Sequence, residues 1–429
     1  MKKIIGIIFL MVITINGYAL EIEGLDFLGL SEVISEKENE SSTNNYNLEN
    51  KIEFNGEFDV SLKFNKNDDN TMLYKLKLDK NLIEEYTYQN SLGLNLNAEY
   101  SFEKFEFILR TYSNYINDDN SSFNLYEAYL TFSPNYNFYY QVGKSSIYWG
   151  KGYAFNPIGV INPIKDPDDP ENSGEGKNML NLEYTKSYSK GIIQNFTGNL
   201  VLLFENNDTE NGLGEIENIA TAFKSYFLVM DSDLDFVFYN GNDQKSVGMD
   251  ISKNIIPELE IHGEYIYNYD TNLNSINQSG ELIEEKGESS SYLIGMKYLL
   301  KTNTSIVLEY FYDGKRLEKV DYDNVYNNYK DDYTKAFNTY KKFVKNPMQK
   351  YLYLKVSQPE PLNLLYSNIS YTNIYNLLDN SNSSKVHFSY EPYNNMNYYV
   401  DFFGLIGEES TEFGDKLNIG SEVGVKIIF

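Results

Sequence analysis

Apolar and polar residues alternate along most of this 429-residue chain. From Lys51 onward, stretches of roughly 10 residues with period-two alternation are separated by clusters of Asn, Asp, Ser and Gly. This pattern predicts strands with one apolar and one polar face. It favours an all-β fold, a transmembrane antiparallel up-and-down β-barrel over residues 51–429. A soluble β-sandwich is the alternative, although its strands are shorter and carry fewer aromatic residues at their ends.

The last strand is the clearest one. In residues 416–429 the apolar positions share one face, and the chain ends on Phe429. This segment resembles the C-terminal targeting strand of bacterial outer-membrane barrels, and the resemblance implies that Phe429 is a signal to the barrel assembly machinery. Counting back from Phe429 gives about 19 candidate strands, and we expect about 18 because bacterial single-chain barrels have even strand numbers.

The spacing of the strands also predicts an orientation. The last strand of such barrels ends in the periplasm, so short turns belong on that side and long loops on the cell surface. The expected short turns are 101–104, 133–136, 187–190, 230–233 and 300–303. The expected surface loops are 114–121, 145–177, 205–217, 268–289, 313–348 and 404–415, and rough helical spacing predicts a short helix within 313–348.

The N-terminal residues predict export. Lys2 and Lys3 precede an apolar run over residues 4–15, and Gly17-Tyr18-Ala19 forms a small-x-small cleavage site. The run is shorter than the roughly 20 residues of a spanning helix. Residues 1–19 are therefore a predicted signal peptide, and residues 20–50 a periplasmic or lumenal segment with little periodicity. We expect the mature protein in the outer membrane of a Gram-negative cell, in contact with the lipid bilayer and lipopolysaccharide.

Composition narrows the function. The 40 Tyr and 26 Phe suit aromatic girdles at the membrane interfaces, and zero Cys excludes disulfides. A net charge of -26 makes nucleic acid an unsuitable partner. With only two arginines, Arg110 and Arg316, the chain cannot build an arginine cluster, so any pore should favour cations.

Inward positions of the predicted strands are mostly acidic or amide residues. A water-filled interior needs polar walls, so this favours a channel. The alternative is that these side chains bridge one another inside a narrow, closed lumen. The candidate lumen-wall residues are Glu99, Glu106, Arg110, Glu260, His262, Glu264 and Glu422.

The segment 145–177 differs from the rest of the chain. Residues 142–157 read V-G-K-S-S-I-Y-W-G-K-G-Y-A-F-N-P, and the segment contains the single Trp and Pro157, Pro163, Pro167 and Pro170. This segment resembles one in large, uncharacterised porin-like outer-membrane barrels and, more distantly, in the capsule-anchoring barrels. Its glycines permit backbone angles that other residues rarely adopt, and its prolines fix their own φ angles, so the loop should have a defined shape.

Two roles are open for this loop. It can fold into the lumen as a constriction that contacts solutes, or its aromatic residues can simply pack beneath it. The acidic residues Asp166, Asp168, Asp169, Glu171 and Glu175 suggest calcium, but prolines intervene and the calcium-loop spacing is absent, so we predict no metal and no cofactor. The candidate constriction residues are Lys144, Tyr148, Trp149, Lys151, Tyr153, Phe155, Asp166, Asp168 and Asp169.

No arrangement of residues predicts an enzyme. His387 and Ser389 lie two residues apart on a strand and resemble the His-x-Ser of outer-membrane phospholipase, but the surrounding motif is missing. The sequence therefore predicts an outer-membrane, porin-like channel for passive diffusion of small hydrophilic solutes, preferably cationic or neutral. The alternative is a surface structural or anchoring protein for polysaccharide or the cell envelope, with a closed lumen.

Overall fold

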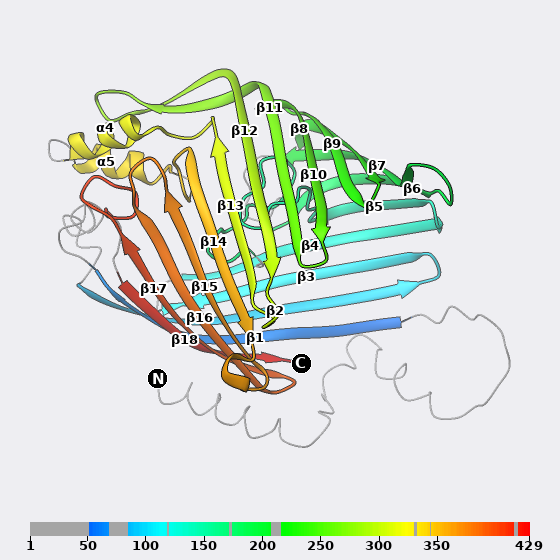
Figure 1. Cartoon of the computed structure of the whole chain (residues 1–429), viewed down its shortest axis with the longest axis horizontal. Coiled ribbons are helices and arrows are strands. Elements are labelled where there is room, and N and C mark those ends of the chain that lie inside the picture. The colour runs from blue at the N-terminus through cyan, green and yellow to red at the C-terminus, as the bar shows by residue number, and fades with distance from the viewer. Residues whose placement is uncertain are drawn as a thin grey trace. The chain divides into compact units, whose positions relative to one another are not determined.

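The fold is a closed β-barrel. The computed structural model describes residues 51–67, 85–117, 120–170, 174–206, 216–329, 333–343, 345–415 and 419–429. The predicted signal peptide and the segment 20–50 lie outside the described residues. Every strand pairs antiparallel with the next, and β18 pairs with β1, so the 18-stranded sheet has no edge (Figure 1). The predicted fold class and the preference for 18 strands over 19 are confirmed.

The strands follow one another in chain order around the barrel. Neighbours along the chain are neighbours in the sheet, which is the up-and-down arrangement. Their bounds are β1 (Lys51–Lys66), β2 (Tyr86–Phe102), β3 (Phe105–Ile116), β4 (Asn120–Asn135), β5 (Phe138–Ser145), β6 (Lys177–Ser187), β7 (Ile193–Asn206), β8 (Ile216–Val229), β9 (Ser232–Asn240), β10 (Gln244–Ile256), β11 (Leu259–Ile276), β12 (Leu282–Leu299), β13 (Ser305–Asp313), β14 (Lys350–Pro359), β15 (Ser367–Asn376), β16 (Asn382–Tyr393), β17 (Met396–Ile406) and β18 (Ile419–Ile428).

The alternation of the sequence becomes two faces of the sheet. On β10, Val247, Met249 and Ile251 are 45–47% exposed and point outward, whereas Ser246 and Asp250 are 1% exposed and point into the barrel. An apolar outer face suits lipid, and the closed ladder of hydrogen bonds satisfies the backbone there.

Short connections join the strands at one end, at 103–104, 136–137, 188–192, 230–231 and 300–304. Two expected long loops are wrong. Residues 114–121 are mostly strand, because β3 continues to Ile116 and β4 begins at Asn120. Residues 268–289 are also mostly strand, since β11 and β12 continue as a hairpin closed by residues 277–281. The Asn277 side chain caps that turn by accepting the N–H groups of Ser279 (3.0 Å) and Glu281 (2.9 Å).

The helices are few and short. α4 (Lys319–Tyr329) and α5 (Tyr333–Tyr340) lie in the connection between β13 and β14, and the 3₁₀ helix η3 (Pro361–Asn363) lies between β14 and β15. The helix expected within 313–348 is thus a pair of helices at one end of the barrel (Figure 1). Within the described ranges, no helix is long and apolar enough to cross a membrane.

The seam between β1 and β18 is closed by the last residue. The Phe429 N–H donates to the Gly56 carbonyl at 3.0 Å, and the Gly56 N–H donates to the Phe429 carbonyl at 2.8 Å. A side chain on Gly56 would begin 2.6 Å from the Phe429 ring, so the ring occupies the space that a residue 56 side chain would need. The role of Phe429 as an assembly signal stays a prediction.

Candidate functional site: an inner loop and a polar cavity

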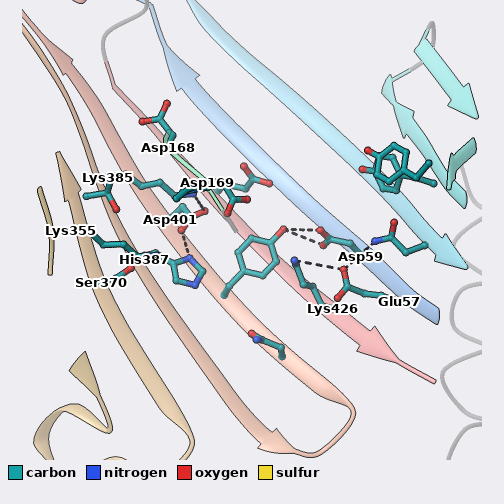
Figure 2. Close-up of a pocket in the computed structure, with 18 of the residues that line it drawn as sticks. Glu57, Asp59, Asp168, Asp169, Lys355, Ser370, Lys385, His387, Asp401 and Lys426 are labelled. Atoms are coloured by element: carbon teal, nitrogen blue, oxygen red, sulfur yellow. Dashed lines mark hydrogen bonds and ion pairs between the residues drawn. The ribbon is translucent and has the colours of Figure 1, made fainter. Parts of the chain in front are cut away.

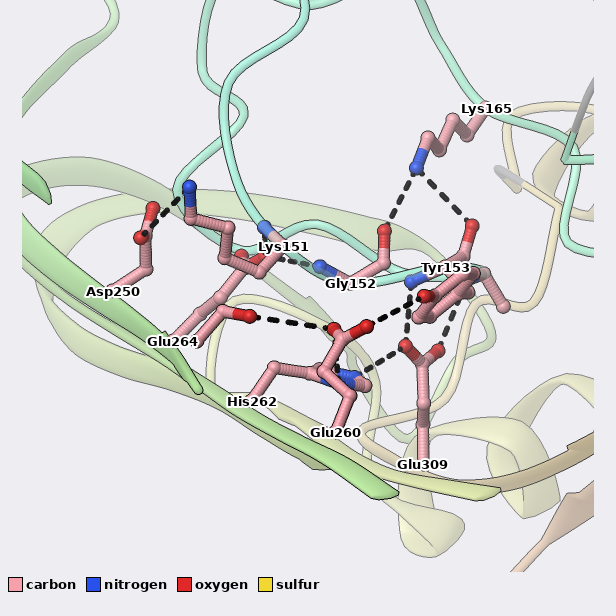
Figure 3. A network of polar contacts seen from close by, with 11 residues as sticks. Lys151, Gly152, Tyr153, Lys165, Asp250, Glu260, His262, Glu264 and Glu309 are labelled. Atoms are coloured by element: carbon pink, nitrogen blue, oxygen red, sulfur yellow. Dashed lines mark hydrogen bonds and ion pairs between the residues drawn. The ribbon is translucent and has the colours of Figure 1, made fainter. Parts of the chain in front are cut away.

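The connection between β5 and β6, described at residues 146–170 and 174–176, lies against the inner face of the barrel, and we call it the inner loop. Its backbone lies outside the strand ladders, and buried backbone N–H groups require acceptors. Glu264 on β11 accepts the N–H groups of Lys151 (2.6 Å), Gly152 (2.6 Å) and Ile158 (3.2 Å). Figure 3 shows Glu264, together with Glu309, extending from the barrel wall toward the loop.

A second wall glutamate completes the attachment. Glu309 on β13 accepts the N–H groups of Tyr153 (2.5 Å) and Ala154 (2.9 Å), and its carboxylate lies 3.0 Å from His262 Nε2. Hydrogen bonds to charged groups are stronger than neutral ones, so two carboxylates holding five N–H groups fix the loop firmly. The Tyr153 hydroxyl adds a bond of 3.2 Å to Glu260.

The two glycines of W-G-x-G are explained by this attachment. Gly150 has φ +97, and a side chain there would begin 2.7 Å from Glu264 Oε1. A side chain on Gly152 would begin 1.9 Å from the Phe155 carbonyl oxygen. Only glycine allows the backbone to approach the carboxylate so closely. Trp149 and Asn162 then close the loop, since the Trp149 N–H donates to Asn162 Oδ1 and Asn162 Nδ2 donates to the Trp149 carbonyl, both at 2.8 Å.

Lys151 enters a buried acidic patch of the wall. Its Nζ lies 3.3 Å from Asp235 Oδ2 and 4.0 Å from Asp250 Oδ1, and Lys224 Nζ lies 3.9 Å from the same oxygen of Asp235. Burial alone would lower the pKa of Lys151, but the carboxylates of Asp235 and Asp250 outweigh it and raise that pKa. The lysine therefore stays charged and acts as an electrostatic contact between loop and wall.

Several predicted roles need correction. Trp149 (2% exposed) and Phe155 (4%) are buried and offer no aromatic surface to a solute. Phe155 instead stacks on Phe311 with ring centroids 4.3 Å apart. Glu264 and His262, expected on a water-filled wall, are buried because the inner loop covers them.

The other candidate residues are distributed over several environments. Lys144 is buried and paired with Glu175, Tyr148 is 48% exposed, and Tyr153 and Glu260 are partly buried where they meet. Asp166 and Asp168 both form ion pairs with Lys345, and the Lys345 Nζ–Asp168 Oδ2 distance is 2.7 Å. In the part of the chain that the structure describes, no group of three His, Cys, Asp or Glu residues is placed to hold a metal ion.

The inner loop shares a hydrophobic core with the connection between β13 and β14 and with the connection between β17 and β18. We call the described residues of these two connections, 314–329, 333–343, 345–349 and 407–415, the cap. Phe155 of the inner loop packs in one cluster with Phe311 and Tyr351 of the wall and with Tyr322 and Phe413 of the cap. Lys345 of the cap, bound to Asp166 and Asp168, joins the same two parts electrostatically. Loop and cap therefore close one part of the barrel mouth together.

A polar cavity of about 700 Å³ remains beside the inner loop. Figure 2 shows its charged residues on strands from both sides of the β1–β18 seam. Of the predicted lumen-wall residues, Arg110 and Glu422 line it, whereas Glu99 and Glu106 lie outside this lining. Its walls are Glu57, Asp59, Asn95, Asn97, Arg110, Thr111, Tyr112, Tyr126, Asp168, Asp169, Pro170, Lys355, Ser370, Thr372, Lys385, His387, Asn397, Tyr399, Asp401, Glu422 and Lys426.

The cavity carries more negative than positive charge. Six carboxylates line it, against four Lys or Arg residues. Asp401 is paired with both His387 (2.6 Å) and Lys385 (3.1 Å), and Lys426 lies 3.7 Å from Glu57.

Our sequence analysis did not single out the tyrosines of this cavity. Tyr112, Tyr126 and Tyr399 point inward among the polar residues of their strands. Their position in the alternation could have identified them, because each tyrosine lies on the same, inward face of its strand as polar or charged residues, and not on the outward apolar face.

Comparison with known proteins agrees with the barrel. No family model and no curated protein matches the chain. Among solved structures, it is similar to Wzi of Escherichia coli, described as an outer-membrane protein involved in group 1 capsule assembly and as a carbohydrate-binding β-barrel. The identity is 13%, over 88% of this chain and 84% of Wzi, with a TM-score of 0.53. It also matches OprB of Pseudomonas putida (9% identity, 88% and 94% covered, TM-score 0.49) and a mutant porin of Rhodopseudomonas blastica (11%, 88% and 100%, TM-score 0.42).

Proposed function

We propose that this protein is an outer-membrane channel for passive diffusion of small hydrophilic solutes, with a preference for cations. The observation that carries the proposal is the cavity, a polar space with six carboxylates against four Lys or Arg residues in an 18-stranded barrel. Excess negative charge along a narrow path raises the local concentration of cations and disfavours anions.

The outward face supports a membrane location. Apolar and aromatic residues such as Phe54, Phe223, Phe238 and Phe402 are 40–61% exposed on the outside of the sheet. Surface of this kind is unfavourable in water and favourable in lipid, and a closed sheet leaves no backbone group unsatisfied in the bilayer. The outer membrane is the bacterial membrane in which such barrels are found.

The inner loop is the proposed constriction of this channel. It narrows the lumen by filling the space along β6 to β14, and its tip residues Asp168 and Asp169 line the remaining cavity. Its buried aromatic residues then hold the shape of the constriction, while the charged tip meets the solute.

Surface anchoring is the second candidate. The hydrophobic core shared by the inner loop and the cap favours it, because this core closes part of the mouth. The fold likeness to the carbohydrate-binding barrel Wzi makes polysaccharide the ligand to test.

Conductance separates the two candidates. Refolded protein would be inserted into a planar bilayer, and single-channel current and reversal potential would be measured in a potassium chloride gradient. We expect steady current steps and a reversal potential that shows a higher permeability for K⁺ than for Cl⁻. A folded barrel that conducts no current would contradict the channel and favour the anchoring protein. A heat-modifiable band on gel electrophoresis checks that the barrel is folded.

A further inference from the structure

One carboxylate of the cavity is framed by tyrosines from both sides. Asp59 lies on β1, at the seam of the barrel (Figure 2). On one side, the Tyr399 hydroxyl of β17 donates to Asp59 Oδ1 at 3.1 Å. On the other side, the Tyr112 hydroxyl of β3 and Asp59 both lie next to Gly93 of β2. Each tyrosine thus lies one intervening strand away from Asp59, β18 for Tyr399 and β2 for Tyr112.

Glycines on the intervening strands make this approach possible. A side chain on Gly424 of β18 would begin 2.4 Å from the Tyr399 ring, so only glycine leaves room for it. A side chain on Gly93 of β2 would begin 3.3 Å from the Tyr112 hydroxyl and 3.5 Å from Asp59 Cβ. Gly93 is the direct ladder partner of Asp59. The two tyrosines thus lean over glycines toward one carboxylate.

Further aromatic surface lies beside this pair. The rings of Tyr112 and Tyr126 have centroids 5.5 Å apart, and both residues line the cavity. Tyrosine rings carry negative charge on their faces and attract cations within about 6 Å of the centroid. A carboxylate in the same cavity as these rings can attract an organic cation through its charge, while the rings contact the apolar groups of the cation.

From this geometry we infer that Asp59, Tyr112, Tyr126 and Tyr399 form a binding site for small organic cations of the alkylammonium class. The inference rests on the proposed function, because it names the class of solute that a cation-preferring channel would hold. A cationic side chain of the protein already uses this wall. Lys426 Nζ lies 6.0 Å from the centroid of the Tyr399 ring and 3.7 Å from Glu57.

The charges favour a cation over a neutral sugar. Around the seam, Glu57, Asp59 and Glu422 supply three carboxylates and Lys426 one ammonium group. Tyr399 donates its hydroxyl proton to Asp59, so this hydroxyl is not available as a donor to a sugar. Asp59 keeps further lone pairs for a solute that brings its own donors or charge.

The test is equilibrium binding to the purified, refolded full-length protein. Choline chloride would be titrated by calorimetry into protein in detergent micelles, beside its uncharged isostere 3,3-dimethyl-1-butanol and glucose. We expect saturable binding of choline alone. Asp59→Asn should weaken it at least tenfold, and Tyr112→Leu by roughly 2- to 30-fold, the range that a cation–π contact contributes.

A matched control variant distinguishes binding at this site from a general attraction of cations to the acidic interior of the barrel. Glu183→Gln removes an inward carboxylate on β6 that lies outside the cavity lining and accepts a bond of 2.8 Å from Asn199. It should leave choline affinity unchanged. Tyr399→Phe keeps the ring and should weaken binding less than Tyr112→Leu.

The outcomes are distinct from those of the conductance experiment. Equal binding of choline and its uncharged isostere, or unchanged affinity in Asp59→Asn, would overturn the cation site. Cation-selective current without choline binding would also reject the site while the channel stands. Choline binding to a barrel that carries no current would support the site and reject the channel.

Discussion

The lumen has two halves in which similar inward carboxylates do different things. Along β6 to β14, which we call the packed half, the inner loop covers the wall, and Glu309 and Glu264 accept its backbone N–H groups. Along β14 to β18 and β1 to β4, the open half, Glu422 and Asp59 line a polar cavity. An inward carboxylate is therefore no sign of water by itself; what it contacts depends on whether a loop lies over it.

The largest expected difference between the halves comes from removing one glutamate in each. Glu309→Ala leaves the N–H groups of Tyr153 and Ala154 without their acceptor and removes the contact of His262 Nε2 with this carboxylate. At about 1.5–3 kcal/mol for each hydrogen bond to a charged group, docking of the inner loop should weaken by roughly 3–6 kcal/mol. Trypsin should then cut the loop at Lys151 or Lys165 while the barrel stays folded on a gel.

Glu422→Ala is the matched change in the open half. It removes a cavity-lining carboxylate, so its effect on unfolding should stay within about 0.5 kcal/mol. It should instead lower the preference of the channel for K⁺ over Cl⁻. Equal protease resistance in Glu309→Ala and Glu422→Ala would mean that the inner loop does not depend on its carboxylate contacts.

A smaller effect should come from pH, through the cap that covers the packed half. Burial raises the pKa of Asp415 to about 7, above its value of about 4 in an unfolded chain. A raised pKa means that the Asp415 carboxyl holds its proton more tightly in the folded cap than in the unfolded chain. The protonated carboxyl therefore contributes fully to the stability of the cap below pH 4, and this contribution is lost as the pH rises through 7.

Docking of the cap should therefore weaken by about 3 kcal/mol between pH 5 and pH 8. Hydrogen-exchange protection factors of α4, measured at both values, would report the change. Asp415→Asn should remove most of this pH dependence, because the side chain no longer titrates. A pH dependence that persists in the variant would assign the effect to other groups.

The sequence predicted the fold well because the alternation is a local property. The outward apolar residues follow from it, and so does the inward phase of Asp59, Glu264 and Glu422. The alternation alone gave about 19 strands, and the even strand number of bacterial barrels was needed to arrive at 18. It did not predict which inward residues meet the inner loop, since Lys151 and Glu264 are more than a hundred residues apart and their contact depends on closure of the barrel.

One local signal of the packed half was nevertheless present. Residues 200–204 form a continuous apolar run, and β7 is indeed apolar on both faces there. Its inward residues Val201 and Leu203 are buried in a cluster with Trp149, Ile158 and Ile161 of the inner loop. A strand that faces lipid on one side and water on the other would alternate, so a continuous run indicates that something covers the inner face.

The smallest expected effect lies at the seam of the open half. Phe429→Ala removes the ring that covers Gly56, but the ring is 55% exposed, and both backbone bonds between residues 429 and 56 remain. A partly buried aromatic contact is worth about 1 kcal/mol, so the urea midpoint in lipid vesicles should fall slightly. Phe429→Leu keeps apolar volume over Gly56 and should recover part of the loss. A normal midpoint combined with poor assembly in cells would assign Phe429 to targeting and not to the stability of the seam.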